Sequence, residues 1–402
     1  MTTRNGDRTM KFANRAGHFA QGDGFRAFVP TPLPPDPPIQ FDDEMHALLS
    51  LADRKLGRLD GITQILPNPD LFVSMYVRKE AVLSSQIEGT QASFADVLGA
   101  EWQAGNDSRR EAVGEISNYV QAMNWGLAEL EHFPLSLRLL RQIHEKLIRG
   151  TRGTHRNPGE FRTTQNWIGP AGCTPGNATF IPPSVPDMQK ALGDLELFLH
   201  AEDKLPALVK IALIHAQFET IHPFLDGNGR MGRLLIAFWL CQREILSKPL
   251  LYLSFYFKKN RAEYYNRLME VRKTGDWEEW VKFFLRGVAS VADEATSSAK
   301  AILKLKEDCA AKLQALKQAT GHGLHLLDIL FERPFIRRRE LIRLLGVSSP
   351  TAGHVLDAFL RTGMLTDTSP GRIRNKLYAF TGYIDILNRG TELEEAETSA
   401  HA

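Results

Sequence analysis

The stretch Phe218–Leu235, FETIHPFLDGNGRMGRLL, carries more information about this chain than any other part of it. Its apolar residues recur at helical spacing, which predicts one helix ending just before His222 and another beginning near Arg230. Between them, Gly-Asn-Gly at 227–229 lets the turn adopt positive φ values and allows close backbone approach. N–H groups at a helix N-terminus attract anions, and Arg230 and Arg233 add fixed positive charge. This pattern is typical of a polyphosphate site.

Two further residues of the stretch supply chemistry. Asp226 is a hard oxygen ligand suited to a magnesium ion that also binds phosphate oxygens. His222, just before the turn, can take a proton from an attacking hydroxyl group. Taken singly, each residue also fits an ordinary turn or helix cap. Together, in one ordered run, they indicate transfer of a nucleotide.

Residues 222–233, HPFLDGNGRMGR, resemble the Fic family signature HPFx(D/E)GNGRxxR and match it at every fixed position. The resemblance implies a mainly α-helical core with a short β-hairpin flap. It also implies transfer of AMP from ATP, with Mg²⁺, to a Ser, Thr or Tyr hydroxyl of a protein, which can include the enzyme itself. The implied roles are general base for His222, magnesium ligand for Asp226, phosphate cradle for Gly227, Asn228 and Gly229, phosphate-binding cations for Arg230 and Arg233, and packing for Phe224.

A second segment, Ser84–Thr90 (SSQIEGT), resembles the inhibitory helix motif (S/T)xxxE(G/N) of the same family. Glu88 precedes Gly89, a natural helix stop, so its carboxylate lies at the unfavourable end of the helix dipole and needs a nearby cation. The resemblance implies that Arg233 is this cation, that Ser84 bonds within the motif, and that Glu88 blocks productive binding of ATP.

Two other parts of the active site are expected from the resemblance. Residues 161–183 resemble the flap, in which Thr179, Phe180 and Ile181 would align an extended target segment by main-chain hydrogen bonds. Buried packing of Phe180 and Ile181 is equally compatible with the sequence. For the adenine pocket the candidates are Asn260, Tyr264 and Tyr265, with simple core packing as the alternative.

The chain divides by composition and periodicity into six segments. They are a Pro-rich, extended arm at 1–40, a helical region with the inhibitory helix at 41–150, the catalytic core at 151–290, a linker helix at 291–320, a winged-helix domain at 321–388 and a disordered acidic tail at 389–402.

The C-terminal unit has the outline of a winged helix-turn-helix domain, with three helices and a hairpin around Pro370-Gly371-Arg372. Residues 331–380 hold nine basic and four acidic side chains, although the whole chain carries only +2. DNA binding through this unit is therefore one hypothesis, and dimerisation or docking of a partner is the other.

The remaining composition excludes several classes of protein. Lysine and arginine number 49 against 47 acidic residues, so no global field points to nucleic acid or membrane. Three scattered cysteines form no disulfide or zinc pattern. The longest apolar run, Leu234–Cys241, is too short to span a bilayer. We expect a cytoplasmic protein without membrane contact.

Two alternatives stay open beside an autoinhibited AMP transferase. One is a deAMPylase that uses the same site, with Glu88 orienting a water molecule. The other is a DNA-binding regulator in which the Fic-like core is only a scaffold; the intact charges of His222, Asp226 and both arginines argue against it. A metalloprotease is excluded, because His215 and His222 are seven residues apart and no HExxH motif is present.

Overall fold

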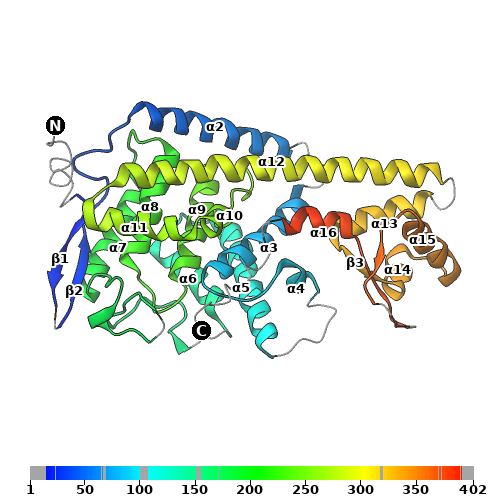
Figure 1. The fold of residues 1–402 in the computed structure, drawn as a ribbon, viewed down its shortest axis with the longest axis horizontal. Coiled ribbons are helices and arrows are strands. Elements are labelled where there is room, and N and C mark those ends of the chain that lie inside the picture. The colour runs from blue at the N-terminus through cyan, green and yellow to red at the C-terminus, as the bar shows by residue number, and fades with distance from the viewer. Residues whose placement is uncertain are drawn as a thin grey trace, which may run out of the picture.

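The computed structural model describes residues 15–389 and Thr391, except residues 23, 65, 67–68, 100–106, 151–154, 171, 317–319, 370, 373 and 390. The molecule is elongated, and one long helix, α12 (Trp277–Ala315), runs along its upper edge in Figure 1. Helix α2 (Asp43–Gln64) lies along α12. Because α12 is continuous from the core to the C-terminal unit, the boundary expected near residue 290 falls inside a single helix.

The N-terminal arm differs from its prediction. Strands β1 (Gly17–Gln21) and β2 (Arg26–Pro30) form an antiparallel hairpin, in register from Gly17–Pro30 to Gln21–Arg26. The first proline of the chain is the last residue of β2, so no proline interrupts the hydrogen bonds between β1 and β2. The prolines that follow keep the chain extended beyond the hairpin. Phe28 is buried and its N–H donates to the Ile181 carbonyl, which docks the hairpin on the core.

The rest of the larger part of the molecule is helical, as the sequence predicts. Its N-terminal region contains α3 (Pro69–Ile87), α4 (Phe94–Gly99), α5 (Asp107–Leu130) and α6 (Leu137–Ile148). The core adds α7 (Val185–His200), α8 (Ala207–Ile221), α9 (Asn228–Gln242), α10 (Ser254–Lys259) and α11 (Arg261–Thr274).

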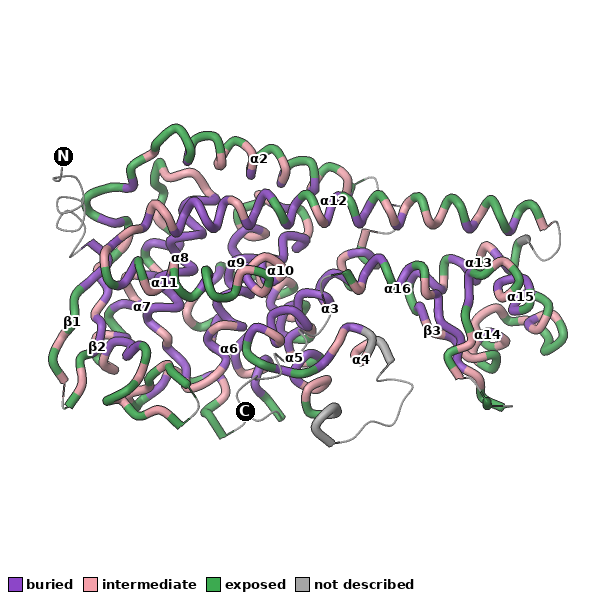
Figure 2. Tube along the Cα trace, viewed as in Figure 1, coloured by how far each residue is buried: buried purple, intermediate pink, exposed green. Residues whose placement is uncertain are grey.

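Helices α8 and α9 form the centre of this core. Every residue of α8 from Leu208 to Ile221 is buried, and so are eleven of the side chains that follow Asn228 in α9, as the purple trace in Figure 2 shows. Both helices are therefore packed on every side, although they also carry buried charged residues such as Lys210 and Arg233. The turn between α8 and α9 is thereby held by buried elements on both sides.

The excursion at 155–183 forms less β-structure than a hairpin flap requires. One antiparallel bridge joins Ile168 to Phe180, and a short 3₁₀ helix, η2 (Pro175–Asn177), lies between them. Prolines at 170, 175, 182 and 183 remove ladder donors on both sides of the bridge. The expected flap is therefore an irregular loop closed by a single bridge.

The C-terminal unit is built from three helices, a small sheet and one last helix. Its elements are α13 (Thr320–Glu332), β3 (Phe335–Arg337), α14 (Arg338–Leu345), α15 (Ser349–Arg361), β4 (Thr366–Asp367), β5 (Leu377–Ala379) and α16 (Thr381–Asn388). The antiparallel sheet has the order β3-β5-β4. The sequence reading did not identify α16, which packs on α3, α4 and α12.

The polar tail expected from residue 389 lies almost wholly outside the residues that the structure describes. The exceptions are Arg389, which is exposed at the end of α16, and Thr391, which is buried. The Thr391 hydroxyl donates to the Asn388 carbonyl, and its own carbonyl accepts from the Gln86 side chain. Disorder is therefore the wrong prediction for this residue.

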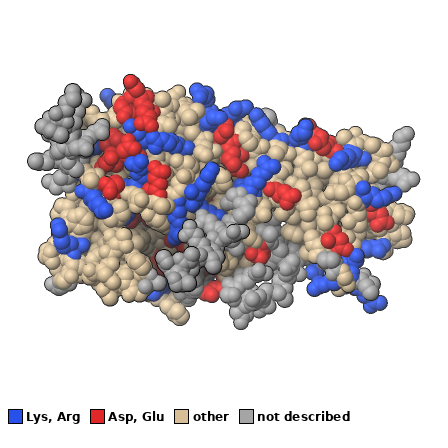
Figure 3. Space-filling view, in the orientation of Figure 1, with Lys and Arg blue, Asp and Glu red and all other residues tan. Residues whose placement is uncertain are grey.

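Within the described part of the chain, no helix has the length and apolarity needed to cross a bilayer. Figure 3 shows acidic and basic side chains interspersed over one face of the molecule. This mixture agrees with the small net charge of +2.

Candidate active site

The turn between α8 and α9 has left-handed backbone at both ends. His222 closes α8 with φ 49°, and Gly227 opens α9 with φ 77°. A positive φ is unusual for a residue with a side chain, so His222 needs support from its surroundings. A Cβ atom on Gly227 would lie 2.7 Å from Ile148, which explains glycine there.

Asn228 fixes the turn from inside. Its Oδ1 accepts from the Phe224 N–H at 2.8 Å, and its Nδ2 donates to the Phe224 carbonyl at 2.8 Å. The side chain is buried and satisfied by these two bonds. Of the expected phosphate cradle, Asn228 therefore contributes only its backbone N–H, because its amide side chain is occupied in shaping the loop.

His144 supports the same turn from α6. Its ring stacks on Phe224 at 3.7 Å between centroids, with 7° between planes. Nδ1 accepts from the Gly159 N–H, so Nε2 carries the proton and donates to the Asp226 carbonyl at 2.9 Å. Burial lowers the pKa of His144 to about 4, which keeps this neutral tautomer.

The expected contact between Glu88 and Arg233 is present, whereas the Ser84 hydroxyl bonds to Arg233 and not within its own segment. The Glu88 carboxylate lies 2.6 Å from Arg233 Nη2, and the same guanidinium donates from Nε to Ser84 Oγ at 2.8 Å. Nη2 also donates to the Ser84 carbonyl at 3.0 Å. Ser84 and Glu88 are four residues apart, so both face α9 from the end of α3.

Gly229 shows where this carboxylate lies. A Cβ atom built on Gly229 would be 2.2 Å from Glu88 Oε1. Gly229 is in the first turn of α9, whose initial N–H groups have no intrahelical acceptor. Glu88 therefore occupies the anion position at the N-terminus of α9.

Glu88 and Arg233 stabilise each other in their charged forms. Burial raises the pKa of Glu88, but the charge and hydrogen bond of Arg233 and the charge of Arg230 outweigh it and hold that pKa below its usual range. Burial lowers the pKa of Arg233, while Glu88 above all raises it, and the net shift is upward. The Glu88 side chain keeps 38% of its surface exposed, so the pair stays open to displacement from solvent.

His222 is held as a neutral imidazole. Burial lowers its pKa to about 3, and the positive charge of Arg272 acts in the same direction. Its Nδ1 is buried without a well-formed hydrogen bond, although the Glu219 backbone raises the pKa to a smaller degree. A neutral imidazole without a strong partner can accept a proton.

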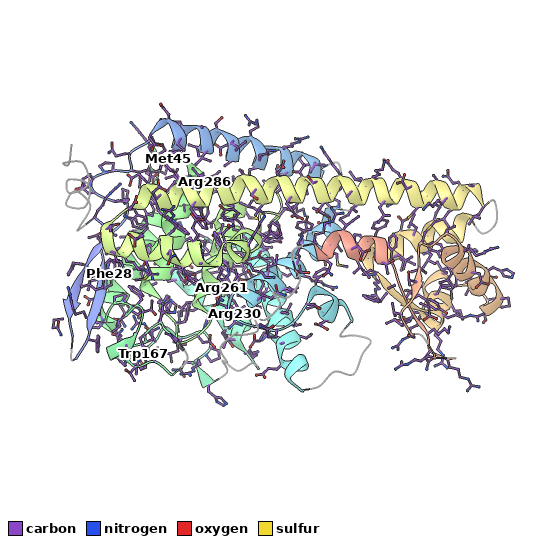
Figure 4. All side chains as sticks on the ribbon, in the orientation of Figure 1. Phe28, Met45, Trp167, Arg230, Arg261 and Arg286 are labelled. Atoms are coloured by element: carbon purple, nitrogen blue, oxygen red, sulfur yellow. The ribbon has the colours of Figure 1, made fainter. Side chains whose placement is uncertain are left out.

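Arg230 and Asp226 flank the anion position. Arg230 is buried, and its Nε and Nη1 have no hydrogen-bond partner, which leaves two donors for an anionic ligand. Figure 4 shows Arg230 in the middle of the helical core. The Asp226 carboxylate, 42% exposed, accepts from the Gly227 N–H and lies 3.6 Å from Arg230.

Asp226 fits a magnesium ion that arrives with a nucleotide. No group of three His, Cys, Asp or Glu side chains that could hold a metal occurs among the residues described. Magnesium in nucleotide sites commonly takes one or two carboxylates, with phosphate oxygens and waters completing the shell. A single exposed carboxylate beside an anion position agrees with this donor set.

Family models match the chain at this site and before it. Residues 46–128 match the N-terminal model of the Fic/DOC family, and residues 134–240, which include the α8–α9 turn, match the Fic/DOC family model. Residues 134–240 are a Fic/DOC family domain, preceded by the N-terminal region of that family.

Relatives of the Fic domain agree with this assignment. A protein adenylyltransferase Fic from Culex quinquefasciatus is 30% identical over 182 residues, 44% of this chain and 32% of that protein. Protein adenylyltransferase fic-1 from Caenorhabditis elegans is 28% identical over 163 residues, 40% of this chain and 28% of that protein. The similarity thus spans about a third of the length of these relatives.

A solved structure shares the fold. A Fic family protein from Desulfovibrio desulfuricans G20 aligns with a TM-score of 0.55 and 20% identity, over 86% of this chain and 98% of that protein.

The expected adenine pocket of the Fic domain is only partly available. Tyr264 is 1% exposed, and its hydroxyl bonds His215 Nε2 at 2.9 Å, so it is a core residue rather than a base contact. Asn260 Nδ2 donates to the Tyr256 carbonyl. Tyr265 keeps 40% of its surface exposed, and burial and the nearby charge of Glu88 raise its pKa to about 12. Tyr265 is therefore the residue free to meet a base.

The expected target-docking strand of the Fic domain is also shorter than predicted. Phe180 and Ile181 are buried, the Phe180 backbone pairs with Ile168, and the Ile181 carbonyl accepts from Phe28. Thr179 is exposed. Because the Ile181 carbonyl already bonds to β2, Thr179 is the exposed residue among the three expected docking residues.

The sequence reading missed two buried arginines next to the Fic turn, Arg162 and Arg272. Arg162 lies within the flap segment 161–183, and Arg272 lies in α11, whose sequence shows little amphipathic pattern. No motif marks either residue, and only the packed structure brings them to His222.

Proposed function

We propose that this Fic-domain protein transfers AMP from ATP to a hydroxyl side chain of a protein and that Glu88 keeps the transferase inactive. The observation that carries the proposal is the Glu88 carboxylate above Gly229, 2.6 Å from Arg233, at the anion position of α9. The printed names of the relatives, protein adenylyltransferase, support the reaction.

Each residue has a role in this reaction. After Glu88 leaves, the polyphosphate of ATP takes its place and accepts hydrogen bonds from the first N–H groups of α9 and from Arg230 and Arg233. The target hydroxyl attacks the α-phosphorus, its proton passes to the His222 imidazole, and the bond to pyrophosphate breaks. Mg²⁺ on the Asp226 carboxylate would neutralise phosphate charge when bound.

The test is transfer of label from α-labelled ATP with Mg²⁺ to the protein itself and to proteins of a cell lysate. Glu88→Gly should raise incorporation strongly over wild type, and Glu88→Gly with His222→Ala should abolish it. Glu244→Gly is the matched control, because Glu244 is an exposed glutamate at φ 55° after α9 and should leave incorporation unchanged. Equal labelling from γ-labelled ATP, or no labelling in Glu88→Gly, would refute AMP transfer.

The alternative deAMPylase is separated by the same variants. Glu88→Gly that has labelled itself is purified and mixed with excess wild-type protein. Release of labelled AMP by wild type, and none by Glu88→Gly, would show that Glu88 supports removal of AMP. If the label stays on the protein both with and without added wild-type protein, the chain is a transferase that does not remove AMP.

For the C-terminal unit we propose a winged helix-turn-helix domain. Helices α14 and α15 are joined by a tight turn with Gly346 in the left-handed region, and β4 and β5 flank a loop with Arg372 and Arg374. Basic side chains gather at the lower end of this unit in Figure 3. Binding of duplex DNA by the full chain should then weaken steeply with salt; an affinity independent of salt would remove the DNA-binding hypothesis.

A further inference from the structure

Two arginines beside the proposed catalytic turn are buried without a carboxylate partner. Arg162 is 1% exposed and Arg272 is 7% exposed. Neither forms an ion pair with any residue in the part of the chain that the structure describes. Removing a charge from water is costly, and an apolar side chain of similar size would often be as stable or more stable. What these guanidinium groups contact must therefore explain why they are there.

Arg162 contacts the backbone of the turn and both ends of the adjoining loop. Its Nε donates to the His222 carbonyl at 3.1 Å and its backbone N–H donates to Pro223 at 2.9 Å. Nη1 donates to the Thr164 carbonyl at 3.2 Å, and Nη2 donates to the Pro183 carbonyl. One side chain thus ties His222 to the start and the end of the loop that carries Thr179.

Arg272 contacts the end of α8 on the other side of His222. Its Nη2 donates to the Glu219 carbonyl at 3.1 Å, and its Nε donates to Thr220 Oγ1 at 3.1 Å. A cation near the last carbonyls of a helix is favourable for the helix dipole. The guanidinium also lies 3.9 Å from the centre of the Phe180 ring, so it connects α8, α11 and the loop.

His222 needs such support. Its φ of 49° is a conformation that residues with side chains rarely adopt, and it persists only where the surroundings impose it. Arg162 donates a hydrogen bond to the carbonyl of His222 itself. Arg272 donates to Glu219 and Thr220, the residues three and two positions before His222 in α8.

We propose that Arg162 and Arg272 are positioning residues for His222: Arg162 fixes the turn against both ends of the target-side loop, and Arg272 fixes the end of α8 and holds a positive charge there. The proposal rests on the proposed AMP transfer, with His222 as base. Neither residue is assigned a contact with nucleotide or target.

Burial has the largest effect on the pKa of His222 and lowers it. The charges of Arg272 and, more weakly, Arg162 lower this pKa further, whereas the Glu219 backbone and the charge of Glu88 raise it. Removing Arg272 should therefore raise the pKa of His222. Burial lowers the pKa of both guanidinium groups to about 10, so both are charged at neutral pH.

The first experiment measures AMP transfer by Glu88→Gly carrying Arg272→Met, Arg272→Lys, Arg162→Met or Arg162→Lys. Arg272→Met should move the acidic limb of the pH profile of kcat/KM upward by about 1 pH unit, and Arg272→Lys should restore most of the original profile. Arg162→Met should lower kcat about 10- to 100-fold, with KM for ATP changed less than about 2-fold.

The matched control is Arg267→Met. Arg267 is on α11, as Arg272 is, but is partly exposed and pairs with Glu263 and Glu279. This variant should keep the pH profile and kcat of the parent. An unchanged pH profile in Arg272→Met, or a rise of KM for ATP without loss of kcat in Arg162→Met, would overturn the proposal.

A second measurement does not depend on activity. Histidine ring carbons are labelled, the His222 signal is assigned by its loss in His222→Ala, and its titration is followed by NMR in the parent and in Arg272→Met. A higher pKa in Arg272→Met supports the positioning role even if no AMP transfer is found, which separates it from the proposed function. An equal pKa refutes it. Should Arg162→Met fail to fold, kcat of Arg162→Lys carries the test, since lysine retains the charge but loses the fork of donors. Should Arg272→Met fail to fold, Arg272→Gln, which also lacks the charge, replaces it in the titration.

Discussion

Gly229 is the residue at which the anion position of α9 and the glutamate of α3 meet. A methyl group there would lie 2.2 Å from Glu88 Oε1 and 3.0 Å from Arg233 Nη1. The Glu88 side chain is flexible and partly exposed, so it can move away, but it then loses its bond to Arg233. Glycine at this position is needed for close approach, whether the occupant is a carboxylate or a phosphate.

We expect Gly229→Ala to lower the free energy of unfolding by about 1 kcal/mol, the contribution of a partly exposed charged hydrogen bond. In Glu88→Gly the same substitution should cost much less, because the carboxylate is absent. Urea unfolding of the four proteins measures the difference. Gly193→Ala, in α7 with open space at its Cβ position, is the control and should be neutral or slightly stabilising. Equal costs of Gly229→Ala in both backgrounds would contradict the contact.

Glu219 gives a prediction for pH dependence. It is buried next to Gly232, its Oε1 has no hydrogen-bond partner, and burial raises its pKa to about 7. A carboxyl whose pKa is higher in the folded than in the unfolded state lowers stability as pH rises, here between about 4.5 and about 7. Glu219→Gln should therefore gain stability relative to wild type at pH 8 and not at pH 4.5. A difference that is the same at both pH values would show that Glu219 does not titrate in this range.

At the scale of elements, the last turn of α3 faces the first turns of α9. Ser84 and Ser85 are adjacent and both are fully buried, but only Ser84 contacts Arg233. The hydroxyl of Ser85 has no hydrogen-bond partner. Alanine substitutions at the two serines can therefore be compared. Both remove a buried hydroxyl from α3, but only the substitution at Ser84 also removes a hydrogen bond to Arg233.

Ser84→Ala should destabilise the protein by about 1.5–3 kcal/mol, because a buried guanidinium loses an acceptor. It should also raise AMP transfer, though less than Glu88→Gly does, since the Glu88–Arg233 bond remains. Ser85→Ala should be neutral or stabilising and should leave transfer unchanged. Thermal unfolding and α-label incorporation measure both effects, and similar behaviour of the two alanine variants would contradict the assignment.

At the scale of the whole molecule, the C-terminal unit contacts the segment that carries Glu88. Helix α16 packs on α3 and α4, and Gln86, two residues before Glu88, donates to the carbonyls of Thr391 and Ala92 at 3.0 and 2.9 Å. The end of α3 is thus held both by α9 and by the chain that follows α16. A change in the C-terminal unit can therefore alter how firmly Glu88 is held.

Gln86→Leu removes both bonds and should raise AMP transfer in the wild-type background. In Glu88→Gly it should have no effect, since no inhibitory side chain is left to release. Gln121→Leu on the exposed face of α5 is the control. If Gln86→Leu changes transfer equally in both backgrounds, the C-terminal contact acts on the active site by a route other than Glu88.

The sequence by itself determined most of the helices and the turn at 222–230, and its resemblance to the Fic family implied the pairing of Glu88 with Arg233. These follow from local periodicity, from glycines at positive φ and from two long motifs. It did not determine the β1–β2 hairpin, the irregular loop around the Ile168–Phe180 bridge, the burial of Tyr264 or the docking of α16, because each depends on which distant surface covers it. Arg162 and Arg272 belong to the same group: an arginine is normally exposed, and only tertiary packing decides that these two are buried beside His222.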